Sequence, residues 1–152
     1  MADALKPFGD PDKPSKVEQA KQASENLRGT IADVLASDAE NFDHDDYQLM
    51  KFHGIYQQDD REARALARVT GMGKQYSFML RLRIPAGVLT PEQYLAMDAL
   101  ADDVTYNSSL RITTRQAFQL HGVLKGQLEG TMESINQRLL STLNGCGDVE
   151  RN

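Results

Sequence analysis

The sequence is poor in several features that would place it in a special class of protein. It has one cysteine, Cys146, in 152 residues, which excludes an internal disulfide and is too few for a zinc or iron–sulfur site built by this chain alone. No apolar run approaches the roughly 20 residues of a membrane-spanning helix. The N-terminus also lacks a secretory signal and the arginine-rich character of an organelle transit peptide. We therefore expect a cytoplasmic protein without a membrane segment.

An excess of basic residues is also absent. The 17 lysines and arginines are outnumbered by 22 acids, so the net charge is −5. Nucleic-acid binding depends on surplus positive charge, so this balance argues against a nucleic-acid partner. With 40% apolar and 26% charged residues, the chain has the composition and length of one globular domain with its own core.

The first half of the chain is predicted to be a helical extension. Residues 1–14, with three prolines, read as an extended leader, and residues 15–75 as the extension itself. Ser15 and Glu18 form a capping-box pattern ahead of apolar residues at helical spacing, which predicts one helix over 16–36. A short helix or turn is expected within 43–56, and the polar run 57–64 is interpreted as a loop or solvated surface.

The second half, 76–152, predicts an α+β domain. A strand from Tyr76 ends at Pro85, a helix begins at Thr90-Pro91, and a hairpin and a second helix follow. That second helix is expected to turn Met132, Ile135, Leu139, Leu140 and Leu143 inward. With a last strand near the C-terminus, the order is βαββαβ, the ferredoxin-like half-domain, an antiparallel sheet with two helices on one face. The opposite face is left for a ligand or another domain.

The hairpin carries the strongest functional signal. Its even positions are apolar and its odd positions are polar: Leu110, Ile112, Phe118 and Leu120 against Arg111, Thr113, Arg115, Gln119 and His121. A three-residue loop centred on Arg115 would preserve this parity and set Arg111 opposite Gln119. Two arginines without intervening acids indicate an anionic ligand. A solvated polar sheet face gives the same alternation and remains an alternative.

Four separated motifs resemble one enzyme family. They are Lys51-Phe-His53-Gly54-Ile-Tyr56-Gln-Gln-Asp-Asp-Arg61, Arg81-Leu-Arg83-Ile-Pro85, Leu110-Arg111-Ile-Thr113-Thr-Arg115-Gln-Ala-Phe-Gln119-Leu-His121-Gly122-Val, and Gly147-Asp148-Val-Glu-Arg151-Asn152. In this order they resemble the N-terminal part of assimilatory sulfite reductase, a haemoprotein with sirohaem and a [4Fe–4S] cluster. The match runs from about Leu27 to the end of the chain.

The resemblance implies specific residue roles. Arg111, Thr113, Arg115, Gln119 and His121 look like the residues that hold sirohaem and its carboxylates. Arg81 and Arg151 look like the pair that binds sulfite during its six-electron reduction to sulfide. No metal ligand is expected in this chain.

The resemblance also implies partners and limits. The family's cluster cysteines have no counterpart here, so we expect a fragment, cut in its last strand, that is inactive without the remainder of the polypeptide. The ending Gly145-Cys146-Gly147-Asp148 resembles members that take electrons from ferredoxin; an NADPH flavoprotein is the other donor the family uses.

Two other functions remain open from the sequence. Nitrite reductase, which reduces nitrite to ammonia, shares sirohaem, cluster and architecture, although Phe52-His53-Gly54 and the pair His121-Gly122 look like the sulfite branch. A non-catalytic ferredoxin-like module that binds an anion or a partner protein would need the same polar face without redox chemistry.

Overall fold

The structure is a computed structural model that describes residues 13–145, apart from the side chains of residues 61 and 62. Most of the predicted leader therefore lies outside the described residues. So do Cys146, Arg151 and the predicted last strand.

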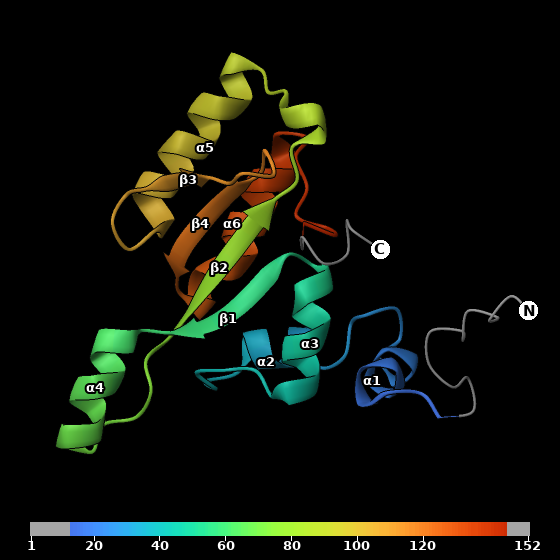
Figure 1. Cartoon of the computed structure of the whole chain (residues 1–152), viewed down its shortest axis with the longest axis vertical. Coiled ribbons are helices and arrows are strands. Elements are labelled where there is room, and N and C mark those ends of the chain that lie inside the picture. Colours follow the sequence, from blue (N-terminus) through green and yellow to red (C-terminus); the bar gives the residue numbers. More distant parts are fainter. Residues whose placement is uncertain (1–12, 146–152) are drawn as a thin grey trace, which may run out of the picture.

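A four-stranded antiparallel sheet forms the centre of the molecule (Figure 1). Its strands lie in the order β1 (Ile55–Asp59), β2 (Tyr76–Leu82), β4 (Phe118–Val123), β3 (Leu110–Ile112). The predicted hairpin is confirmed: Arg111 pairs with Gln119, and the loop spans three residues centred on Arg115, with the Thr113 N–H bonded to the Ala117 carbonyl at 2.9 Å. The ferredoxin-like α+β fold expected from the sequence is therefore the observed fold.

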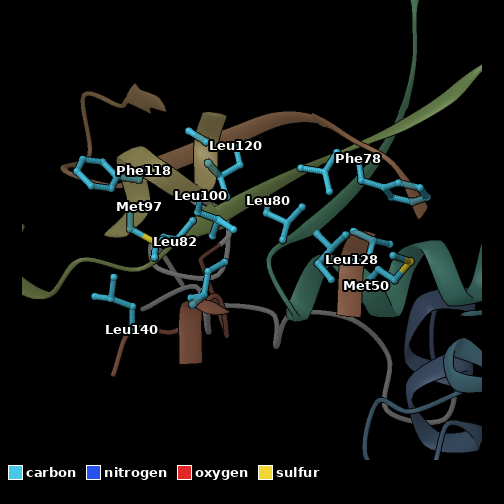
Figure 2. Packing of buried hydrophobic residues seen from close by; sticks show 14 of the residues in the cluster. Met50, Phe78, Leu80, Leu82, Met97, Leu100, Phe118, Leu120, Leu128 and Leu140 are labelled. Atoms are coloured by element: carbon cyan, nitrogen blue, oxygen red, sulfur yellow. The ribbon is translucent and has the colours of Figure 1, made fainter. Parts of the chain in front are cut away.

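Two helices cover one face of this sheet, as predicted. They are α5 (Pro91–Val104) and α6 (Leu128–Gln137). Helix α5 begins with a capping box in which the Thr90 hydroxyl accepts from the Gln93 N–H and the Gln93 amide accepts from the Thr90 N–H. Figure 2 shows the apolar side chains between helices and sheet, which include Phe78, Leu80, Leu82, Met97, Leu100, Phe118, Leu120 and Leu128. Burial of this cluster fixes which face of each strand points inward.

Helix α6 is shorter than its apolar pattern predicts. It ends at Gln137, and Leu139 takes a left-handed backbone with φ 57° and is 92% exposed. Leu143 is also half exposed, so the prediction that these two leucines face inward is wrong. Ile135 and Leu140 are buried as expected, because the chain turns back toward the sheet after the helix.

The prediction of a single helix over 16–36 is wrong. The structure has α1 (Lys16–Ala23) and α2 (Ile31–Ala36), separated by a turn in which the Ser24 hydroxyl accepts from the Leu27 N–H at 3.0 Å. The helix is interrupted because of a contact with a later part of the chain. The buried Asp46 carboxylate of α3 (His44–Phe52) accepts from the Thr30 N–H at 2.9 Å and the Thr30 hydroxyl at 2.6 Å, which fixes the chain where a continuous helix would pass.

The polar run 57–64, interpreted as a loop or solvated surface, contains part of a strand and the start of a helix. Strand β1 pairs along the edge of β2, from Ile55 opposite Leu80 to Asp59 opposite Tyr76. Gln57 points to the helix side, where its amide bonds both the N–H (2.7 Å) and the carbonyl (3.2 Å) of Phe42. That pairing makes a polar residue tolerable in the strand. Helix α4 (Arg61–Thr70) follows and projects from one end of the sheet (Figure 1).

Candidate functional site

The face of the sheet opposite α5 and α6 carries a row of polar side chains across three strands. In the register, Gln119 of β4 lies directly opposite Arg81 of β2 on one side and Arg111 of β3 on the other. Side chains so placed have Cβ atoms roughly 5 Å apart. The strand positions on this open face are Tyr56, Gln58, Ser77, Met79, Arg81, Arg111, Gln119 and His121. The set includes no acid, so the arginine charges are not neutralised by their neighbours on the face.

Arg81, Gln119 and His121 form a hydrogen-bonded chain. One end of the Gln119 amide lies 2.7 Å from Arg81 Nη2 and 3.0 Å from Arg81 Nε, and the other end lies 3.1 Å from His121 Nε2. Because a guanidinium has donors and no acceptor, we assign the end at Arg81 as the oxygen, which accepts both bonds. The Arg81 guanidinium also lies 5.6 Å from the centre of the Tyr56 ring, a cation–π contact. These contacts hold the Arg81 side chain on the open face without any ligand.

The backbone behind Arg81 is held equally closely. Its N–H donates to the Gly54 carbonyl at 2.8 Å. A Cβ built on Gly54 would lie 2.3 Å from the Thr142 carbonyl oxygen, and one on Gly145 would lie 2.6 Å from the Arg81 carbonyl oxygen. Three chain segments therefore cross here at a spacing that only glycine permits.

A β-bulge shapes the other end of the face. Between the pairs Phe78–Val123 and Leu80–Leu120, β2 has one residue, Met79, whereas β4 has two, His121 and Gly122. Gly122 absorbs the extra residue with φ +79°, and a Cβ there would lie 2.5 Å from the Tyr106 Cβ. Because of the bulge, Leu120 and Val123 both face the core, while His121 stays on the open face and the 86%-exposed Tyr106 lies beside it.

The charges on the face act on His121. Burial lowers the pKa of the imidazole first, and the positive charges of Arg111 and then Arg81 lower it further. The imidazole is therefore neutral near pH 7. A neutral histidine between two arginines leaves the guanidiniums as the positive groups of the face.

A hollow of about 870 Å³ opens beside this end of the face. Its lining includes Arg111, His121, Tyr106 and Ser77, and its far side reaches Asp59, which is ion-paired with Arg64. The Arg64 guanidinium also donates a hydrogen bond to the Asp59 carboxylate, and this bond is the main cause of the lowered pKa of Asp59. The polar lining and the size suit a charged ligand larger than a simple oxyanion.

The predicted site residues fall into three groups. Arg81, Arg111, Gln119 and His121 are brought together on the open face. Thr113 and Arg115 lie at the hairpin loop, where the Thr113 hydroxyl accepts from the N–H groups of Arg115 (3.3 Å) and Ala117 (3.2 Å) and Arg115 is exposed at the tip. Arg151 lies outside the described residues.

Sequence reasoning missed Tyr56 as a member of the face. Its partner Met79 is on β2, and that pairing becomes visible only once residues 55–59 are recognised as a strand. The aromatic residue at a strand start was the one available signal.

Within residues 13–145, no cluster of three or more histidine, cysteine, aspartate or glutamate side chains could hold a metal ion. Over the same residues, no helix is long and apolar enough to cross a membrane.

Comparison with known proteins assigns the half domain to a family. The model of the nitrite/sulfite reductase ferredoxin-like half domain matches residues 71–138, which contain β2, α5, the hairpin and α6. Residues 71–138 therefore form a half domain of the nitrite and sulfite reductase family.

Among curated proteins, the chain is similar to sulfite reductase haemoproteins. It is 51% identical over 140 residues to the NADPH sulfite reductase haemoprotein beta-component of Geobacillus kaustophilus, covering 91% of this chain and 24% of that protein. It is 47% identical over 148 residues to the ferredoxin sulfite reductase of Synechococcus elongatus, covering 97% of this chain and 23% of that protein. The chain thus spans about a quarter of the length of these relatives, and identity favours neither electron donor strongly.

A solved structure, the NirA protein of Mycobacterium tuberculosis, shares the fold. The TM-score is 0.70 at 19% sequence identity, over 90% of this chain and 26% of that one. The likeness extends beyond residues 71–138 and so includes much of the N-terminal extension.

Proposed function

We propose that this chain supplies the arginine face of a sulfite reductase, holding sirohaem carboxylates and the sulfite anion during six-electron reduction to sulfide. The observation that carries the proposal is the row Arg81–Gln119–Arg111, with His121 beside it, on a sheet face without acids. The similarity to sulfite reductase haemoproteins at about half identity supports the same assignment.

The donor set fits a polycarboxylate macrocycle. Guanidinium forks, a neutral imidazole and a flanking hollow of about 870 Å³ suit carboxylates spread around a flat ring. In the proposed complex, Arg111, Gln119 and His121 contact the macrocycle from the open face, and Thr113 and Arg115 contact it from the hairpin loop. Sirohaem, coupled to a [4Fe–4S] cluster bound by other residues, would supply electrons to the substrate.

Arg81 is the residue of this chain best placed for the substrate anion. Gln119 occupies its Nε and one Nη2 hydrogen, which leaves the Nη1 end and the second Nη2 hydrogen for sulfite oxygens. Positive charge there favours binding of the anion and stabilises charge that develops on departing oxygens. We assign Arg151 the same role from its motif. Ferredoxin or an NADPH flavoprotein is the proposed electron donor.

The test is a chimera in which the matched segment of the Geobacillus kaustophilus relative is replaced by this chain. We expect Arg81→Ala to lower sulfite turnover with a chemical reductant by a hundredfold or more while the haem absorbance stays, because the cofactor keeps its other contacts. Arg111→Ala should instead reduce the haem content. Arg138→Ala, an exposed arginine after α6, is the matched control.

Full sulfite turnover in the Arg81→Ala chimera would reject the proposed substrate role. A chimera that reduces nitrite in preference to sulfite would assign the chain to the nitrite branch, and one that never takes up haem would favour a non-catalytic binding module.

A further inference from the structure

We infer that Gln119 is a positioning residue that fixes neutral His121 in the tautomer with its hydrogen on Nδ1. His121 then presents an N–H donor, rather than a basic nitrogen, to the hollow. The tautomer follows from the protein's own hydrogen bonds; only the identity of the acceptor rests on the proposed function.

The argument begins at Arg81, because a guanidinium has donors and no acceptor. Two of these donors, Nη2 and Nε, lie 2.7 and 3.0 Å from one end of the Gln119 amide. That end must be the oxygen, since the NH₂ group would place donors against donors. The Arg81 fork therefore determines the orientation of the Gln119 amide.

The amide orientation in turn determines the histidine. With its oxygen on Arg81, Gln119 directs its NH₂ group at His121 Nε2, 3.1 Å away. Nε2 must then accept, so it carries no hydrogen, and in a neutral imidazole the single hydrogen lies on Nδ1. Protonation of Nε2 would place a second donor against the amide.

Nδ1 is open to a ligand. Among the described residues, the hydrogen bond of the imidazole is made through Nε2, and Nδ1 has no partner. Nδ1 is also not buried, because the one buried side-chain polar atom without a partner among these residues is Arg64 Nε. His121 and Arg111 both line the hollow. The charged groups that act on the imidazole are Arg111 of β3 and Arg81 of β2, both cations. A carboxylate or sulfur oxyanion in the hollow is therefore the acceptor that matches an N–H between two cations.

The experiment measures the tautomers directly in the 152-residue chain by long-range ¹H–¹⁵N correlation NMR of the imidazole rings near pH 7.5. The chain has three histidines, and His53 is an internal control, because its Nε2 lies 2.9 Å from the Leu27 carbonyl oxygen and must carry the hydrogen. We expect opposite tautomers, with the hydrogen on Nδ1 in His121 and on Nε2 in His53. A hydrogen on Nε2 of His121, or an even mixture, would overturn the inference.

The variant Gln119→Glu tests the cause. A carboxylate accepts from Arg81 and from Nε2–H together, so we expect the His121 hydrogen to move to Nε2 and the pKa of His121 to rise, with His53 unchanged. An unchanged His121 tautomer in a folded variant would show that Gln119 does not set it. Should this variant fail to fold, the wild-type tautomers decide.

A separate titration addresses the acceptor. Adding sulfite, or a metal-free porphyrin with eight carboxylates, should shift the Nδ1–H resonance of His121 downfield and leave His53 in place. No shift with either probe, in a chain with the expected tautomer, would count against the proposed anionic ligand and leave the tautomer assignment standing.

Discussion

The two faces of the sheet are built from alternate residues of the same strands, yet they are held by different interactions. On β4, Phe118 and Leu120 are buried in the cluster that also contains residues of α5 and α6, whereas Gln119 and His121 face the other way and bond to each other. On β2, the fully buried Leu80 and Leu82 flank Arg81. Adjacent residues therefore serve separate purposes: one side stabilises the fold, and the other is the side that we propose recognises an anion.

The difference shows why the cationic face persists on an acidic chain. The helix-covered face supplies the apolar burial that stabilises the fold, so the open face can leave two arginines without acidic partners. A cationic face is costly for a small domain unless another part of the molecule supplies the stability.

The largest expected effect comes from breaking the helix-covered face. Leu80→Ala removes a side chain with no solvent exposure and should lower the free energy of unfolding by about 3 kcal/mol, through lost burial and the cavity left behind. The next residue is the matched control, since Arg81→Ala removes a few hydrogen bonds on the open face and should cost about 1 kcal/mol. Urea unfolding of both variants measures the contrast, and equal losses would contradict the division of roles.

The bulge that joins the two faces should come next. Gly122→Ala places a Cβ 2.5 Å from that of Tyr106 at a φ of +79°, so we expect a loss of about 2 kcal/mol and displacement of Tyr106. Gly126→Ala is the control, because nothing lies within 4 Å of its added methyl group. That substitution should change the free energy of unfolding by no more than about 0.5 kcal/mol. Thermal unfolding compares the two, and similar stabilities would mean that the bulge tolerates a side chain.

The hairpin was predictable from sequence because its signal is local. Alternation across Arg111 to His121 sets the two faces, and the loop length sets the register, so the pair Arg111–Gln119 follows without knowledge of the rest of the chain. The ferredoxin-like order from residue 76 was predictable for the same reason, since each element carries its own start and stop residues.

The features that sequence reasoning missed depend on contacts far apart in the chain. The break between α1 and α2 depends on Asp46 binding Thr30, and β1 exists because β2 offers an edge and Phe42 satisfies Gln57. The Arg81–Gln119 contact likewise needs the β2–β4 register, which the bulge at Gly122 shifts. No local pattern reports such pairings.

A smaller effect is expected at the hairpin loop. Thr113→Val removes the hydroxyl that accepts from two backbone N–H groups and should cost about 1 kcal/mol. Thr114→Val, at an exposed neighbouring position, is the control and should be nearly neutral. Chemical denaturation of both variants measures whether Thr113 stabilises the hairpin loop. If Thr113 only contacts a ligand, Thr113→Val will leave the free energy of unfolding unchanged.

The smallest effect should appear in the pH dependence of stability. The folded-state pKa of His121 is lowered by burial, Arg111 and Arg81, so between that pKa and the ordinary value of about 6.5 the unfolded chain binds more protons than the folded one. Stability from this group is therefore full above about pH 6.5 and declines as the pH falls toward the folded-state pKa.

The free energy of unfolding is measured at pH 7.5 and 5.5 for the wild type and for His121→Gln. The contribution of His121 is the loss on acidification in the wild type minus the loss in the variant. His44 and His53 remain in both proteins, so the comparison isolates His121. We expect the wild type to lose more stability on acidification than the variant. An equal loss would mean that neither burial nor the two arginines lowers the pKa of His121 in the folded chain, and that the open face behaves as an ordinary solvated surface.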